Sequence, residues 1–188
     1  MKLDKKLNIV IPIDSGWVHA TPISYPVFEK YFMPISKAFS RVFQEGLGTV
    51  AGPRVAYLLL RKVSEDLGIW ETPEGDGVKQ GLMNEIIRLS NVIVIGDKGY
   101  ETHTLYDALK DGILGEEEKS EVLNALVFFT LVSSMHKKAM LDLMLLGMTK
   151  FWGGLTTSLD STAYLASLPM LTQAGSSGEK VIASHIPS

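Results

Sequence analysis

The run from Val122 to Met135, which contains "ALVFFTLV", is apolar on nearly every side of a predicted helix. A helix of this kind must be covered all round, either by the rest of the chain or by further copies of it. The charged run "HKK" follows directly, so the segment falls short of the roughly twenty apolar residues of a membrane span. This segment predicts a central helix around which the other elements pack.

The residues on either side of this run support two interpretations. The acidic run "EEE" at 116–118 precedes it, where a helix N-terminus favours negative charge, which removes most of the case for a metal site there. After "HKK", the segment "AMLDLMLLGM" holds three Met and four Leu in ten residues. These residues are either more of the core or a surface on which adaptable Met side chains bind a partner. The predicted partner-binding residues are Phe128, Met135, Met140, Met144, Met148 and, from the N-terminal hairpin, Trp17.

Two segments are typical of β-hairpins. "LNIVIPI" and "WVHAT" flank the turn residues "DSG", and "VIVIGDKGYETH" has its turn at 96–99. Strand alternation places Trp17 and His19 on one side of the first hairpin, either as a contact patch or as cover for a helix. These hairpins, with helices elsewhere, predict an α+β fold that is mainly helical, with both hairpins packed against a helical bundle.

Helix boundaries follow from proline, glycine and capping residues. Ser24 is expected to cap a helix that Pro34 bends or interrupts near Met33. Gly46 is expected to end this helix, and Pro53 to open the next one, which Gly68 stops. Further short helices are predicted at 78–90, where Gly81 weakens the pattern, at 104–114 and at 160–168. The predicted domain is 1–169, and the small polar residues at 170–188 are predicted to form a flexible tail.

The glycines of "EGLGTVAGPR" raise the possibility of a phosphate-binding loop. Such a loop needs a strand leading in, and GxGxxG spacing or a Lys-Ser/Thr pair. Here a helix leads in, the spacing is GxGxxxG, and Arg54 is the only basic residue that follows. A corner between two helices is therefore the favoured interpretation, and an enzyme with a cleft near Gly46–Arg54 is the alternative.

Composition excludes several other functions. The chain has 188 residues, a net charge of −3 and no cysteine, which argues against nucleic-acid binding and excludes thiolate chemistry and disulfides. The four histidines fall in four different predicted elements, and "GSSG" lacks the GxSxG spacing of a nucleophile elbow. We therefore expect no catalytic residues, no metal, no cofactor and no membrane span, and a cytoplasmic location.

The order of segments along residues 8–169 resembles that of a phage protein family. The segments are "IVIPIDSGWVHATPIS", "VFEKYFMPISKAF", "EGLGTVAGPRVA", "NALVFFTLVSSMHKK" and "WGGLTTSLDSTAYLASLP". Together they resemble the tail assembly chaperones of long-tailed bacteriophages, which are encoded near the tape-measure protein.

The resemblance implies a non-catalytic protein of the host-cell cytoplasm. Its partners would be the tape-measure protein, which it coats, and the tail-tube subunits that polymerise around that protein, and it would form a homo-oligomer. Members of the group often have a longer form made by programmed frameshifting. A structural virion protein at the tail or neck is the alternative that fits the same composition.

Overall fold

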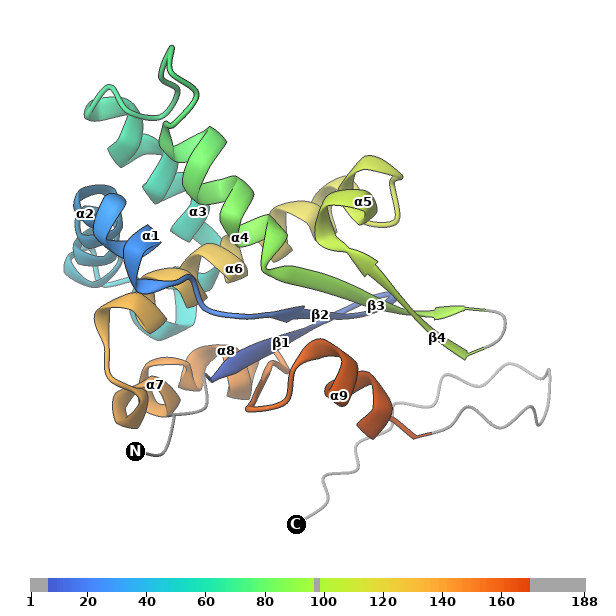
Figure 1. The fold of residues 1–188 in the computed structure, drawn as a ribbon. Helices are drawn as coiled ribbons and strands as arrows, with labels where there is room; N and C mark the ends of the chain where they lie inside the picture. The colour runs from blue at the N-terminus through green and yellow to red at the C-terminus, as the bar shows by residue number, and fades with distance from the viewer. Residues whose placement is uncertain (1–6, 97–98, 170–188) are drawn as a thin grey trace.

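The computed structural model describes residues 7–96 and 99–169. Over these ranges the chain is α+β and mainly helical, with one antiparallel sheet of five strands in the order β4-β3-β2-β1-β5 (Figure 1). The predicted fold class is confirmed. The predicted tail, 170–188, lies outside the described residues.

The two predicted hairpins are present and are joined edge to edge. The strands are β1 (Asn8–Ile13), β2 (Gly16–Ala20), β3 (Ser90–Gly96), β4 (Gly99–Thr104) and β5 (Leu155–Thr157). β2 pairs with β3, with Val18 opposite Val92, so the hairpins form one sheet rather than two separate units. β5 was not predicted. It lies beside β1, with Asn8 opposite Thr157, and its three residues are too few to show a strand pattern.

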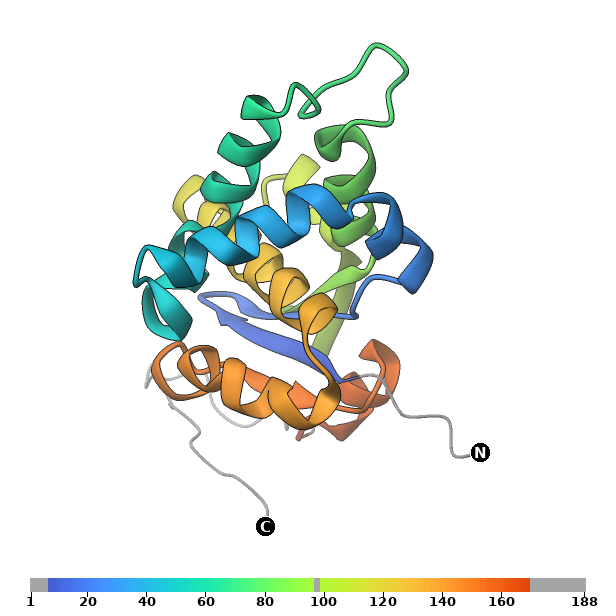
Figure 2. The same cartoon turned by 90° about the vertical axis from the view of Figure 1, so that its left-hand side faces the viewer.

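The helices cover both faces of this sheet. They are α1 (Tyr25–Lys30), α2 (Phe32–Gln44), α3 (Gly48–Asp66), the π-helix η1 (Val78–Met83) that continues into α4 (Asn84–Arg88), α5 (Leu105–Lys110), α6 (Glu116–Met135), α7 (Lys138–Met144), α8 (Leu146–Phe151) and α9 (Ser161–Ser167). Figure 2 shows α6 between the sheet and the layer formed by α2 and α3. The smaller helix α9 lies against the opposite face of the sheet.

α6 is the central helix that its sequence predicts. Each residue from Asn124 to Val132 is buried, and Phe128 and Phe129 are among the largest fully buried side chains. Contacts with α3, α2, α4 and β1 cover it on all sides. The acidic residues 116–118 form its first turn, as predicted, and the Glu118 carboxylate accepts hydrogen bonds from the backbone N–H groups of Gly115 and Asp14.

Proline positions agree with the prediction at one site and not at the other. The break between α1 and α2 falls at Tyr31, and Pro34 lies in the first turn of α2, close to the predicted interruption. The prediction that Pro53 opens a helix is wrong, because α3 begins at Gly48 and Pro53 lies inside it. Proline has no N–H, so the Thr49 carbonyl lacks its helical donor.

The hairpin residues Trp17 and His19 cover α9 rather than forming a free patch. Trp17 is half-buried and meets Tyr100 edge-on, with ring centroids 5.9 Å apart. His19 is buried, and its Nε2–H donates to the Leu159 carbonyl over 2.9 Å. Val10 and Ile93 from the sheet and Tyr164 from α9 complete this second, smaller cluster.

Candidate partner-binding surface

The chain turns sharply after α6 and continues as two short helices. His136 has an extended backbone, φ −124° and ψ 148°, which ends α6 before α7 begins. α7 and α8 are separated at Leu145, which is itself fully buried. Leu141, Leu145 and Met148 form the buried stripe of this pair, at the i, i+4, i+7 spacing of one helical face.

The pair also carries exposed apolar side chains, among the exposed charged residues Asp142 and Lys150. The exposed fractions are 46% for Met140, 59% for Leu143, 38% for Leu146 and 71% for Phe151. We call these four residues the α7–α8 surface. Exposed apolar side chains gathered on one short stretch of chain are typical of protein-binding sites, whereas isolated ones are ordinary.

The six residues predicted for partner binding divide into three groups. Met140 lies on the α7–α8 surface. Met135, Met144 and Trp17 are half-buried against the hydrophobic clusters. The prediction is wrong for Phe128 and Met148, because both side chains lie in the core at 0% and 1% exposure and no partner reaches them in this fold.

The burial of Met148 has a specific cause at the contact between α8 and α3. A Cβ atom added to Gly147 would lie 1.8 Å from the carbonyl oxygen of Thr49. Only glycine permits this close approach, which occurs at the carbonyl that Pro53 leaves without a helical donor. Next to this contact, Met148 is buried and Leu146 is exposed.

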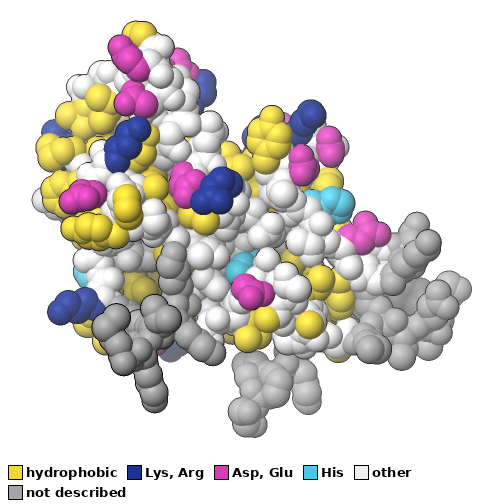
Figure 3. Space-filling model, in the orientation of Figure 1, with side chains coloured by type: hydrophobic (Ala, Val, Ile, Leu, Met, Phe, Trp, Pro, Cys, Tyr) yellow, Lys and Arg dark blue, Asp and Glu magenta, His cyan; other side chains and the backbone are white. Residues whose placement is uncertain are grey.

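A second apolar group with exposed members lies on α1 and α2 and was not predicted as a surface. We call the exposed Tyr25 and Phe32, with the half-buried Phe28 between them, the aromatic ridge. Their ring centroids are 6.1 Å apart from Tyr25 to Phe28 and 5.7 Å apart from Phe28 to Phe32. Figure 3 shows apolar side chains gathered over α1 and α2, and Figure 2 shows that α1–α2 and α7–α8 face the same side of the molecule.

Sequence periodicity did not identify most residues of the α7–α8 surface and of the aromatic ridge as exposed. Phe32 falls on the same helical pattern as the buried Tyr31 and Ile35, and periodicity does not separate the centre of an apolar stripe from its margin. Leu143 and Leu146 fall on the outside because each lies two residues away from a buried position of the stripe formed by Leu141, Leu145 and Met148. The sequence does hold one signal that Leu143 and Phe151 are exposed. Each follows a charged residue, Asp142 or Lys150, and both charged residues are exposed.

A cleft of about 970 Å³ lies beside α3, where the enzyme alternative predicted a pocket. Its lining comes from the β1–β2 turn, α3, the first turns of α6 and the end of α8, and it includes Arg54, Trp152 and the carboxylates of Asp14, Glu116, Glu117, Glu118 and Glu121. The corner is therefore not flat. Among the described residues that line it, none is histidine, lysine or tyrosine.

Several polar groups of this cleft already have partners within the chain. The Arg54 guanidinium lies over the Trp152 ring at 4.5 Å from its centroid. Asn124 is buried, with Oδ1 accepting from the Tyr57 backbone N–H over 3.0 Å and Nδ2 donating to the Ser120 carbonyl over 2.9 Å. These contacts stabilise the packing of α6, α3 and α8. The Arg54 and Asn124 side chains therefore have a structural role that is independent of any ligand.

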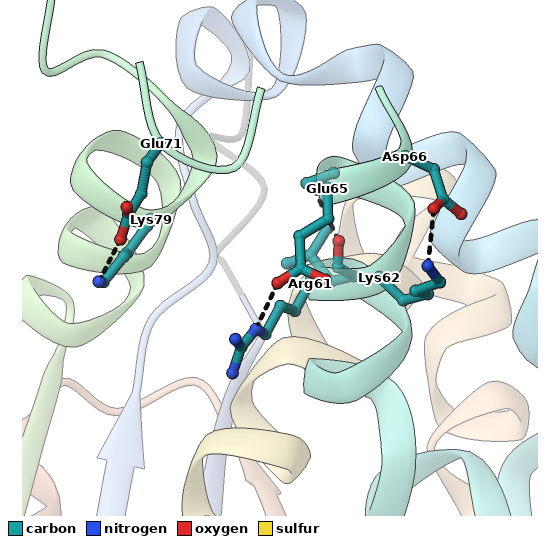
Figure 4. Close-up of polar contacts among 8 residues, drawn as sticks. Arg61, Lys62, Glu65, Asp66, Glu71 and Lys79 are labelled. Atoms are coloured by element: carbon teal, nitrogen blue, oxygen red, sulfur yellow. Dashed lines mark hydrogen bonds and ion pairs between the residues drawn. The ribbon is translucent and has the colours of Figure 1, made fainter. Parts of the chain in front are cut away.

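The charged surface around α3 consists of exposed ion pairs (Figure 4). Arg61 Nε lies 2.7 Å from Glu65 Oε1, and Lys62 Nζ lies 2.9 Å from Asp66 Oδ1. The hydrogen bond from Lys62 lowers the pKa of Asp66. Exposed pairs of this kind contribute little to stability and do not indicate a chemical site.

No metal-binding group is present among the described residues, since no three His, Asp or Glu side chains lie close enough to hold an ion. In the same part of the chain, no helix combines the length and apolar character that a membrane crossing needs. Comparison with protein-family models, curated proteins and solved structures found no match to this chain.

Proposed function

We propose that this protein is a non-catalytic tail assembly chaperone of a long-tailed bacteriophage, acting in the host-cell cytoplasm. Its α7–α8 surface binds the tape-measure protein while tail-tube subunits polymerise around that protein. The observation that carries the proposal is the exposure of Met140, Leu143, Leu146 and Phe151 on one short helical pair. The likeness of segment order to the chaperone family supplies the identity of the partner.

The chemistry of this surface suits a partner made of long, irregular apolar helices. Methionine and leucine side chains adapt to partners of varied shape, and phenylalanine supplies a large contact area. The aromatic ridge, on helices that lie on the same side of the molecule as α7–α8, offers a second apolar surface to a rod-shaped partner. Many weak apolar contacts also dissociate quickly, as required when the tail tube displaces a chaperone.

A pull-down against fragments of the tape-measure protein tests the proposal. The test variant carries Leu143→Asp and Phe151→Asp, which place charge on the α7–α8 surface. We expect at least about a tenfold loss of binding, because apolar residues at the centre of an interface carry most of its affinity. Leu58→Asp is the matched control, since Leu58 is a helical leucine of 56% exposure outside both apolar surfaces.

Undiminished binding by a folded double variant would overturn this assignment of the surface. Circular dichroism and thermal melting establish that each variant is folded. Recovery of the protein in purified virions, rather than only in lysates of infected cells, would instead favour the structural virion protein.

A further inference from the structure

The two edges of the sheet differ in length and in what they leave unpaired. β5 forms one edge with three residues, whereas β4 forms the other with six. In the described part of the chain, no strand pairs with the outer side of β4 (Figure 1). Alternate residues of an edge strand direct backbone N–H and C=O groups outward, where another strand can bind them.

β4 lacks two of the usual features that prevent such pairing. Its sequence, "GYETHT", contains neither proline nor lysine, the residues that commonly block edge strands. Glu101, Thr102 and Thr104 are exposed, and His103 is partly exposed. The second half of the strand is therefore accessible.

Symmetry limits how β4 pairs with a second copy of itself. Hydrogen-bonded and non-hydrogen-bonded residue pairs alternate along an antiparallel ladder, so a two-fold axis perpendicular to the sheet must pass midway between a residue and its own copy, which lie directly opposite each other. For the near-complete overlap of a strand spanning Gly99–Thr104, this central residue is either Glu101 or Thr102.

Charge decides between these two registers. Centring on Glu101 places two carboxylates directly opposite each other, which is unfavourable. Centring on Thr102 places Glu101 opposite His103 on both sides of the axis. An imidazole carries an N–H in either protonation state and donates to a carboxylate. Within one chain, His103 Nε2 already lies 3.8 Å from Glu101 Oε2, so both groups share one face of the strand.

We propose that β4 pairs antiparallel with β4 of a second copy of this chain, centred on Thr102, to form one continuous sheet through two protomers. The interface is stabilised by main-chain hydrogen bonds and by the two Glu101–His103 cross-strand pairs. This inference is independent of the proposed function, because it uses a different surface and requires no phage partner.

Single cysteines test both the contact and its register, since the chain has no cysteine of its own. The full-length variants are Thr102→Cys, Glu101→Cys, His103→Cys and, as a control on exposed α9, Thr162→Cys, each oxidised mildly with diamide. Directly opposed residues have Cα atoms about 4.5–5.5 Å apart, within the range of about 4.4–6.8 Å that a disulfide needs.

The proposed register predicts a distinct pattern of cross-linking. Thr102→Cys should form a disulfide-linked dimer about ten times faster than Thr162→Cys, because only opposed cysteines satisfy the geometry of the bond. Mixed Glu101→Cys and His103→Cys chains should cross-link with each other more than His103→Cys does alone. Cross-linking of the mixed chains no faster than that of His103→Cys alone, or a Thr102→Cys rate equal to that of the control, would overturn the proposal.

Sedimentation of the protein without cysteine gives a second measurement. Wild type should show a reversible dimer, and Thr102→Glu should weaken it by about threefold or more, because it places like charges directly opposite each other. A wild-type protein that stays monomeric at high concentration would contradict the pairing. Equal dimer affinity in the two proteins would contradict it as well.

Discussion

α6 and the α7–α8 pair have similar apolar side chains and opposite environments. α6 is contacted by α3, α2, α4 and β1, and its residues from Asn124 to Val132 are all buried. α7–α8 is covered on one side only, so Leu141, Leu145 and Met148 are buried while Leu143 and Phe151 are exposed. Composition alone therefore does not separate core from surface. The number of neighbouring elements that cover a helix decides which of its apolar side chains are buried.

The largest predicted effect compares two phenylalanines, one from each region. Phe128→Ala should lower the free energy of unfolding by about 3–5 kcal/mol, because it leaves a cavity in the core. Phe151→Ala should change it by less than about 0.5 kcal/mol, because the side chain is exposed. Urea unfolding followed by circular dichroism measures both variants, and similar losses would show that the two regions are equally buried in solution.

A mid-sized effect is expected where α8 meets α3. Gly147→Ala should destabilise the protein by about 1–3 kcal/mol, because its Cβ would collide with the Thr49 carbonyl and force the backbone apart. Leu146→Ala, one residue earlier and exposed, is the control and should have a small effect. Thermal melting measures both. A neutral Gly147→Ala would mean that α8 does not pack as closely as this structure places it.

The smallest effect concerns the hydrophobic cluster between the sheet and α9. Its Tyr164 is less completely buried than Phe128 in α6 and far less exposed than Phe151 in α8. Burial raises the pKa of Tyr164. Its hydroxyl therefore stays neutral in the folded state at a pH where it ionises in the unfolded state. This contribution to stability is present below about pH 10 and is lost as the pH rises through the raised pKa of the folded state.

Tyr164→Phe tests this consequence of burial. We expect the variant to lose less stability than wild type between pH 9 and pH 11, because phenylalanine cannot ionise. Urea unfolding at both pH values measures the difference, and the other tyrosines are common to both proteins. Parallel losses in the two proteins would show that the α9 cluster is open to water.

Turns, helix ends and the buried helix were predictable from the sequence, because each depends on residues that are neighbours in the chain. The hairpins around Gly16 and Gly96–Gly99, the helix end at Gly46 and the apolar length of α6 each follow from neighbouring residues. The pairing of β2 with β3 and the addition of β5 to β1 depend on contacts between distant segments, which periodicity does not report.

The candidate surface was predicted less completely than the fold. The methionine content of residues 139–148 led to the predicted methionine surface. Met148 is instead buried, next to Gly147, which lies very close to the Thr49 carbonyl. Both features depend on packing between α8 and α3, so only a three-dimensional structure reveals them.

The place of β1 between β2 and β5 has a consequence for how the chain is made on the ribosome. Because Asn8 pairs with Thr157, β1 emerges long before the strand that completes its second side. At about 5–20 residues per second, roughly 7 to 30 seconds of translation separate the two. Once β4 has been made, we expect the nascent chain to hold a four-stranded sheet with one side of β1 open to solvent, and synthesis of β5 to close it.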